Sequence, residues 1–126
     1  MKKVLYVCIL LALVACSKKS TPTPDKTIVY QFTGSTSATY HVMYAGPDTR
    51  HVDTTFTGTT WSKTITVNQA TGFKNAVFFI GLTSPNTVIT GNASILVDNQ
   101  LSSQEPLQFD SGEGSTDLTF YAYVFK

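Results

Sequence analysis

The chain has 126 residues, of which 13% are charged, and a formal net charge of +1 at pH 7. This charge is too small to provide the basic field that binding to nucleic acid phosphates requires, so no nucleic acid partner is expected. The charged fraction is about half of the roughly 25% found in soluble proteins. A neutral surface rich in Thr, Ser, Asn and Gln is therefore expected.

The N-terminus carries two lysines and then an apolar run over residues 4–15, which is shorter than the ~20 residues of a membrane span. This pattern is typical of an export signal. The run ends in Leu13-Val14-Ala15-Cys16, which resembles the lipobox of bacterial lipoproteins. The resemblance implies cleavage before Cys16, a diacylglyceryl thioether on its sulfur, and acylation of the new amino group, for example with palmitate. Two or three acyl chains would anchor the protein to a membrane without help from the folded domain.

The segment 17–26 (SKKSTPTPDK) is polar, contains two prolines and has no apolar periodicity. It is expected to be a flexible tether that reaches about 30 Å when extended at ~3.1 Å per residue. The residue after the cysteine is Ser17 rather than Asp, which by resemblance to lipoprotein sorting implies the outer membrane. No acidic run of the kind that directs some lipoproteins to the cell surface follows, so the domain is expected to face the periplasm. The expected organisation is a signal peptide (1–15), a lipidated cysteine with its tether (16–26) and one β domain (27–126).

The chain has two cysteines, and neither is left as a free thiol after this processing. Cys8 lies in the signal peptide, and Cys16 would carry lipid. Disulfides, thiolate catalysis and cysteine metal ligation are therefore not expected in the mature domain.

The remaining residues show a β pattern throughout, and they are enough for one domain. Short runs rich in β-branched and aromatic residues are bounded by turn formers at 27–33, 38–45, 50–56, 60–67, 74–83, 92–98, 101–109 and 116–125. Alternation places one set of side chains on a common face, namely Tyr40, Val42 and Tyr44. A second set contains Trp61, Ile65, Val67 and also Lys63, which we expect near a sheet edge. The pattern predicts an all-β fold, a single antiparallel, immunoglobulin-like β-sandwich of seven or eight strands.

Three segments resemble MmpS-like domains, the mycobacterial membrane protein small family, in their order and spacing. They are VYQFTG at 29–34, WSKTITV at 61–67 and SILVDNQL at 94–101. The chain departs from the family pattern at Thr60, where proline is usual, and at Asn99, where glycine is usual. The resemblance implies a compact β-sandwich. Because members of that family assist a large lipid- and siderophore-exporting transporter, it also implies a transporter-accessory role.

Catalytic and metal-binding chemistry is not expected. Most acidic residues fall in or beside predicted turns, and no nucleophile elbow, phosphate-binding glycine loop or metalloprotease motif occurs. His41 and His51 flank a hairpin. If Ala45 pairs with Arg50 they point to opposite faces, whereas another loop length would bring them together. A cluster of acidic residues, Asp110, Glu113 and Asp117, would at most hold a weakly bound calcium ion. The chain is therefore expected to be non-catalytic, with no cofactor and no metal.

Two surface functions remain as expectations. The first is binding or support of an envelope protein partner. This function predicts a contact surface that is either an apolar patch or a free sheet edge. The alternative is carbohydrate binding through coplanar exposed rings, for which the candidates are Tyr30, Tyr40, Tyr44 and Trp61, with Tyr121 and Tyr123 as further aromatic residues. In addition, the segment Asp53-Thr54-Thr55 resembles an O-glycosylation site of Bacteroides-type envelopes, which would place a glycan on Thr54.

Overall fold

The computed structural model describes residues 22–82, 88–110 and 116–125. These residues form six strands and one short 3₁₀ turn. In chain order they are β1 (Lys26–Ala45), β2 (His51–Val67), η1 (Gln69–Thr71), β3 (Asn75–Leu82), β4 (Ile89–Val97), β5 (Gln100–Phe109) and β6 (Thr116–Tyr123). All strand pairs are antiparallel. The predicted all-β, antiparallel fold is confirmed. In the described part of the chain, no helix has the length and apolar character needed to cross a membrane.

Two of the strands are much longer than the sequence pattern predicts. The runs 27–33 and 38–45 are parts of β1, and the runs 50–56 and 60–67 are parts of β2, so the described residues contain six strands rather than seven or eight. The expected breaks are bends within continuous strands. Between Thr33 and Ala38 the β1–β2 register shifts, and Gly58 on β2 has a φ of 152°, which glycine adopts readily because it has no Cβ.

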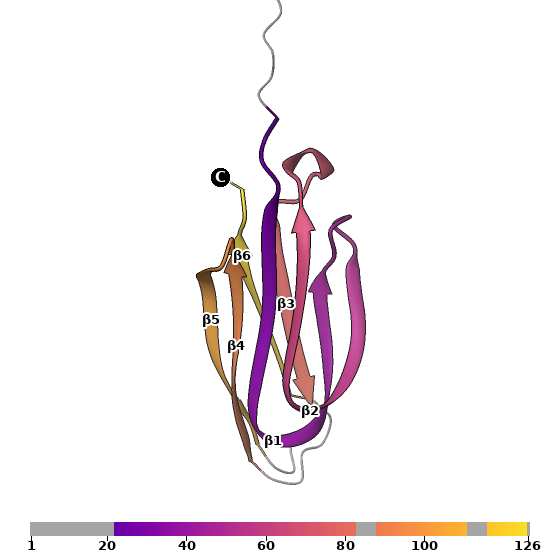
Figure 1. Ribbon diagram of the computed structural model, residues 1–126. Helices are drawn as coiled ribbons and strands as arrows, with labels where there is room; N and C mark the ends of the chain where they lie inside the picture. Colours follow the sequence, from indigo (N-terminus) through magenta and orange to yellow (C-terminus); the bar gives the residue numbers. More distant parts are fainter. Residues whose placement is uncertain (1–21, 83–87, 111–115, 126) are drawn as a thin grey trace, which may run out of the picture.

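The bend in β1 folds the sheet over on itself. The strand order is β5-β4-β1-β3-β6, with β2 paired to β1. The first half of β1 pairs with β4 and the second half with β3, whereas β2 follows β1 along both halves. Rings on the two halves of β1 contact each other, with centroids 5.3 Å apart for Tyr30 and Tyr44 and 4.7 Å apart for Phe32 and Tyr40. Figure 1 shows β1 turning back at the lower end of the molecule.

The space between the two halves is filled mainly by aromatic and aliphatic side chains. The largest fully buried side chains include Tyr30, Tyr40, Phe32, Phe73, Phe78 and Phe109. The hydroxyls of Tyr30 and Tyr40 each have a backbone acceptor, because the Tyr30 hydroxyl donates to the Ala45 carbonyl and the Tyr40 hydroxyl donates to the Thr36 carbonyl, both at 2.9 Å. Such bonds remove the cost of burying a polar group. The predicted common face of Tyr40, Val42 and Tyr44 is confirmed.

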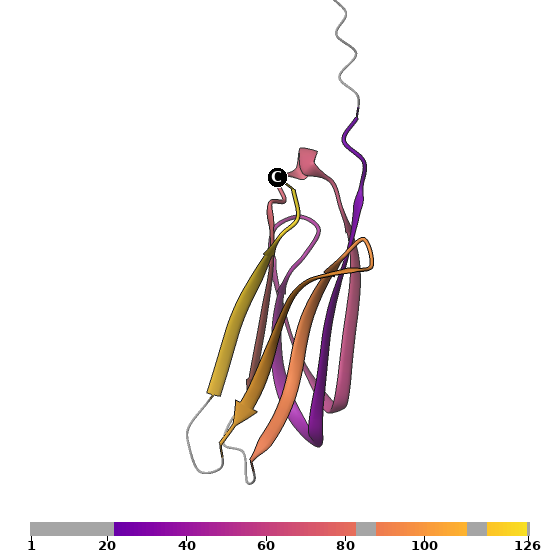
Figure 2. The ribbon, with the colours of Figure 1, turned by 90° about the vertical axis from the view of Figure 1, so that its left-hand side faces the viewer.

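The two ends of the molecule differ in what they carry. We call the end that holds the start of β1 the proximal end. It also contains η1, the β4–β5 turn and the C-terminal residues Val124 and Phe125 (Figures 1 and 2). The opposite, distal end contains the bends of β1 and β2. The chain therefore enters and leaves the domain at the same end.

Candidate functional site

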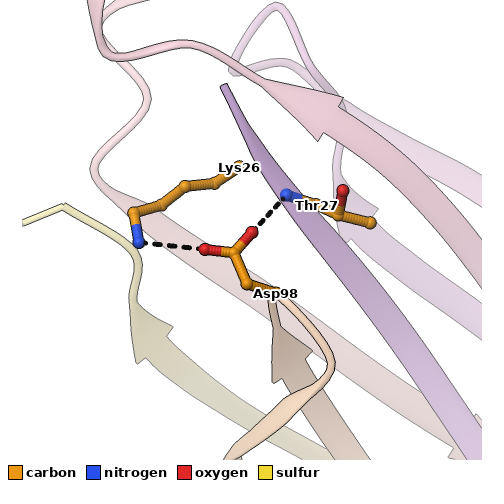
Figure 3. Close-up of polar contacts among 3 residues, drawn as sticks. All are labelled: Lys26, Thr27 and Asp98. Atoms are coloured by element: carbon orange, nitrogen blue, oxygen red, sulfur yellow. Dashed lines mark hydrogen bonds and ion pairs between the residues drawn. The ribbon is translucent and has the colours of Figure 1, made fainter. Parts of the chain in front are cut away.

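The start of β1 is fixed to the β4–β5 turn by three interactions around Asp98, and Figure 3 shows the two that the Asp98 carboxylate makes. The Asp98 carboxylate accepts a hydrogen bond from the Thr27 backbone N–H at 2.9 Å, and the Asp98 N–H donates to the Thr27 carbonyl at 2.8 Å. Lys26 Nζ lies 3.2 Å from the second carboxylate oxygen. Asp98 and Asn99 both have positive φ, at 51° and 64°, as a two-residue type I′ hairpin turn requires. The runs predicted as strands at 92–98 and 101–109 are therefore joined by a two-residue turn, Asp98-Asn99.

The charge of Asp98 is stabilised by this arrangement. The hydrogen bond from the Thr27 N–H, and then the interaction with Lys26, hold the pKa of the Asp98 carboxyl below its usual value. The Lys26 ammonium also lies 5.8 Å from the centre of the Phe125 ring, a distance at which a cation is attracted to the ring face. One lysine thus joins the start of β1 to both the turn and the C-terminal segment.

A second contact holds the residues just before β1. Asn68 caps η1, because its side-chain oxygen accepts from the Ala70 N–H at 2.8 Å. The amide nitrogen of Asn68 donates to Asp25 Oδ1 at 2.5 Å and to the Thr23 carbonyl at 3.4 Å. We call the contacts of Asp98 and Asn68 with residues 23–27 the tether clamp. The expected tether, 16–26, is therefore wrong at its C-terminal end, because these residues bind the domain and β1 starts at Lys26.

Three of the aromatic residues proposed to contact a glycan are in the core. Tyr30 and Tyr40 are 0% exposed and Tyr44 is 6% exposed. Trp61 is half-buried and stacks on Phe78, with 5.7 Å between ring centres. The expectation of a glycan platform at these rings is therefore wrong. Alternation along a strand shows which residues share a face, but it does not show which face is covered, and here the covered face is the aromatic one.

Among the described residues, the two most exposed tyrosine rings lie on β6 instead. Tyr121 is 62% exposed and Tyr123 is 66% exposed, and these residues alternate with the buried Ala122 and Val124. The two rings are 6.3 Å apart and meet edge to face, with 83° between their planes. They are therefore not coplanar, as stacking on a flat sugar would require. The alternation of aromatic with smaller residues over 121–124 is the sequence signal that could have found them.

These tyrosines continue a wider apolar surface. In the sheet register Met43 lies opposite Phe79, and Val77 lies opposite Tyr121. Met43, Val77 and Phe79 are half-buried although they point away from the core. We call the surface formed on β1, β3 and β6 by these three residues with Tyr121 and Tyr123 the apolar outer face. The polar His41–Asp53 pair borders it, because the His41 ring lies 5.5 Å from the Phe79 ring and Asp53 lies opposite Met43.

The outer face of the other half of the sheet is more polar, although the half-buried Val29 and Leu96 lie opposite each other on it. On β1, Gln31 lies opposite Ser62 of β2 and Ser94 of β4, and Ser94 lies opposite Gln104 of β5. Thr64 is also exposed on this surface. We call it the polar outer face. Its hydroxyl and amide side chains match the expected uncharged surface. Water can hydrogen-bond to these side chains, so this face does not need a binding partner to cover it.

An open groove lies between the facing edges of β5 and β6 at the proximal end. It has a volume of about 330 Å³, and its lining includes Val97, Leu101, Tyr123 and the Lys26–Asp98 pair. Leu101 is 60% exposed, which is unusual for a leucine in a strand. We call this feature the proximal groove.

The two histidines lie on one outward face, contrary to the register that pairs Ala45 with Arg50. The loop between β1 and β2 is one residue longer, so that Ala45 pairs with His51, and His41 pairs with Thr55. His41 Nε2 lies 2.5 Å from Asp53 Oδ1. Among the described residues, no group of three His, Cys, Asp or Glu side chains is arranged to hold a metal ion.

The remaining predicted site residues are those of the lipobox, the calcium cluster and the glycosylation motif. The lipobox residues and Cys16 lie outside the described residues, as does Glu113 of the suggested calcium cluster. Thr54 lies on β2 opposite Val42 and is half-buried, on the side of the strand that faces the core. O-glycosylation of Thr54 remains a prediction.

Comparison with known proteins gives no family for this chain. No family model matches the sequence, and no curated protein matches it significantly. The resemblance to MmpS-like domains therefore remains a prediction.

Proposed function

We propose that this protein is a non-catalytic, lipid-anchored lipoprotein of the bacterial envelope, and that its β domain binds an envelope protein through the apolar outer face. The observation that carries the proposal is the difference between the two outer faces of the folded sheet. One carries mainly hydroxyl and amide side chains around the half-buried Val29 and Leu96. The other carries Met43, Val77, Phe79, Tyr121 and Tyr123, beside the His41–Asp53 pair.

The chemistry of the apolar outer face suits a protein surface better than a sugar. A contiguous apolar patch on a small domain is a common mark of a protein interaction site. Tyrosine is also enriched among the residues that contribute most to protein binding, because its ring buries a large apolar area while its hydroxyl keeps a hydrogen bond. The edge-to-face arrangement of Tyr121 and Tyr123 provides two knobs rather than one flat platform.

The expected anchor would hold the domain close to the membrane by its proximal end. Six Cα–Cα steps separate Cys16 from Pro22, so this piece of chain spans at most about 20 Å. The tether clamp prevents residues 23–27 from adding to this reach. The strands, and with them the apolar outer face, then rise from the outer membrane into the periplasm, where a neighbouring envelope protein, such as a transporter, meets them from the side.

The experiment is recovery of native complexes with the full, lipidated chain. The protein is purified from the envelope of cells that make it, after mild crosslinking, and co-purifying proteins are quantified by mass spectrometry. The test variant changes both Tyr121 and Tyr123 to threonine, which removes the rings but suits a strand. Loss of two such contacts is expected to lower recovery of the specific partner by about tenfold or more.

The matched control places threonine on the polar outer face, as Gln31→Thr with Gln104→Thr. Both glutamines are exposed, so the control changes the same number of surface residues to the same residue type. It should recover the partner at the wild-type level. Equal recovery with the tyrosine variant and the wild type would contradict the proposal. So would failure to recover any envelope protein while the wild-type protein binds a glycan array, because carbohydrate binding would then be the better account.

A further inference from the structure

We infer that the partner binds by adding an extended β-strand to the free edge of β6, with one of its apolar side chains in the proximal groove. This inference rests on the proposed function and specifies how the partner is bound. It depends on three features: the direction of the backbone groups of β6, the protection of the other sheet edges, and the position of the groove.

The backbone of β6 offers hydrogen-bonding groups on its free side. Within the described residues, β6 pairs only with β3. The Val124 N–H donates to the Lys74 carbonyl at 3.0 Å, next to the paired residues Asn75 and Tyr123. Because alternate residues of an antiparallel strand bond to the same neighbour, the N–H and C=O groups of Tyr121 and Tyr123 point away from β3. The two most exposed rings therefore belong to residues whose backbone groups are also free to pair.

The other two edges of the sheet carry features that oppose strand addition. On β2, Lys63 lies opposite the buried Tyr30, on the side of the strand that faces the core, and a charge in this position discourages further pairing. On β5, Glu105 lies opposite the buried Ala93, and Pro106 follows it. Proline lacks the N–H that a new strand would need. The β6 sequence from 119 to 123 contains no charged residue and no proline.

The proximal groove is placed to receive a side chain of the added strand. Strands in a sheet lie about 4.8 Å apart, and their side chains alternate between the two faces. A strand beside β6 would place one set of side chains next to Tyr121 and Tyr123 on the apolar outer face. The other set would point into the gap between β6 and β5, where Leu101 is 60% exposed. An apolar residue at this point would cover Leu101 and Val97.

The occupant is a segment of a different protein rather than a second copy of this chain. Antiparallel pairing of two β6 strands would put the two proximal ends at opposite ends of a joint sheet. The ten residues of β5 alone span about 33 Å. With about 20 Å of chain between each domain and its expected lipid, two such copies would reach one membrane only by lying flat along it. One outer face of each copy would then be turned onto the lipid.

The test compares Tyr121→Pro with Tyr121→Thr in the full, lipidated chain, using the recovery assay described above. Both variants lose the ring, but only proline removes the outward N–H, and this N–H is not bonded to β3. Recovery of the partner is expected to be at least about tenfold lower with proline than with threonine. Equal recovery would overturn the inference. The thermal unfolding midpoint of each variant checks that the domain is folded.

A measurement on the wild-type protein avoids dependence on the proline variant. Amide hydrogen exchange is compared between the free protein and the purified complex. The amides of Tyr121 and Tyr123 should exchange at least about tenfold more slowly in the complex, because they acquire acceptors. Unchanged exchange at both amides overturns strand addition, and so does a complex that contains only copies of this chain. If the tyrosine variants lose the partner while these amides are unchanged, the proposed function stands and only this inference fails. If no partner protein is recovered with the wild-type protein, both the proposed function and this inference are contradicted.

Discussion

Asp98 and Thr27 exchange two hydrogen bonds, one from each backbone N–H, and so join the β4–β5 turn to the first residues of β1. The Thr27 N–H donates to the Asp98 carboxylate, and the Asp98 N–H donates to the Thr27 carbonyl. The residue separation is 71. This long-range contact fixes the point at which the chain enters the domain, and therefore the direction in which an anchored domain is held.

The acid sensitivity of the domain should depend on Asp98. Its pKa is lowered in the folded state, so the stabilisation is present above the unfolded-state pKa of about 3.9 and is lost as pH falls through the lower, folded-state pKa. Asp98→Asn keeps a residue that tolerates positive φ but removes the charge. Thermal unfolding followed from pH 7 to pH 2 should show a smaller acid-induced loss in this variant. An unchanged pH profile would contradict the role of the Asp98 charge.

Alkaline pH should destabilise the domain through Tyr30. Burial, and then the proximity of Tyr44, raises the pKa of the Tyr30 phenol well above 10. The stabilisation is therefore complete below pH ~10, the unfolded-state pKa, and decreases as pH rises towards the folded-state value. Tyr30→Phe should cost about 1 kcal/mol at pH 7, because the bond to the Ala45 carbonyl is lost. It should also make the unfolding free energy less dependent on pH above 10. Chemical denaturation at pH 7 and pH 11 measures both effects.

The bend of β1 depends on a pair of glycines. Gly34 and Gly91 lie opposite each other in the sheet. A Cβ on Gly91 would lie 2.8 Å from the Thr33 carbonyl oxygen and 3.0 Å from the Phe32 ring. Gly91→Ala should therefore destabilise the domain by about 1–3 kcal/mol, as overpacking of a close contact does.

The control for this variant is Thr90→Ala, one residue earlier on the exposed face of β4. It should change the unfolding free energy by no more than about 0.5 kcal/mol. Urea denaturation of both variants makes the comparison. If Gly91→Ala is as stable as Thr90→Ala, the close approach at the bend is not required.

The lipid anchor is tested separately from the fold. Cys16→Ala should release the protein from the membrane fraction and abolish metabolic labelling with palmitate, while the circular dichroism of the β domain stays unchanged. The physical reason is that in a lipoprotein the acyl chains would supply the membrane affinity. A variant that is still membrane-bound and labelled would contradict the lipoprotein interpretation.

The sequence was sufficient for the class of the fold and for several local features. Period-two alternation placed Tyr40, Val42 and Tyr44 on one face, and the runs 92–98 and 101–109 left a break where the structure has the Asp98–Asn99 turn. The number of strands could not be predicted in this way. The Gly34–Ser37 stretch has the composition of a loop, but β1 continues through it because Gly34 pairs with Gly91 of β4 and the flanking residues Thr33 and Ala38 both pair with β2. Composition reports local preference, whereas strand continuity depends on contacts distant in sequence.

The candidate site was harder to predict for a similar reason. The exposed pair, Tyr121 and Tyr123, was visible as aromatic residues, but so was the buried pair Tyr30 and Tyr40. Only the folded sheet shows which rings are covered. The contact of Asn68 with Asp25 joins residues 43 positions apart, and a short polar segment with two prolines gives no local sign that it binds the domain.

The most direct test of the proposed function is photo-crosslinking in living cells that make the full, lipidated protein. A photoreactive amino acid is placed at Tyr121 or Tyr123 on the apolar outer face, and at Gln31 or Gln104 on the polar outer face. The account predicts a covalent adduct with one envelope protein from the tyrosine positions and none from the glutamine positions. Adducts from the glutamine positions alone, or adducts only with glycan or lipid, would contradict it.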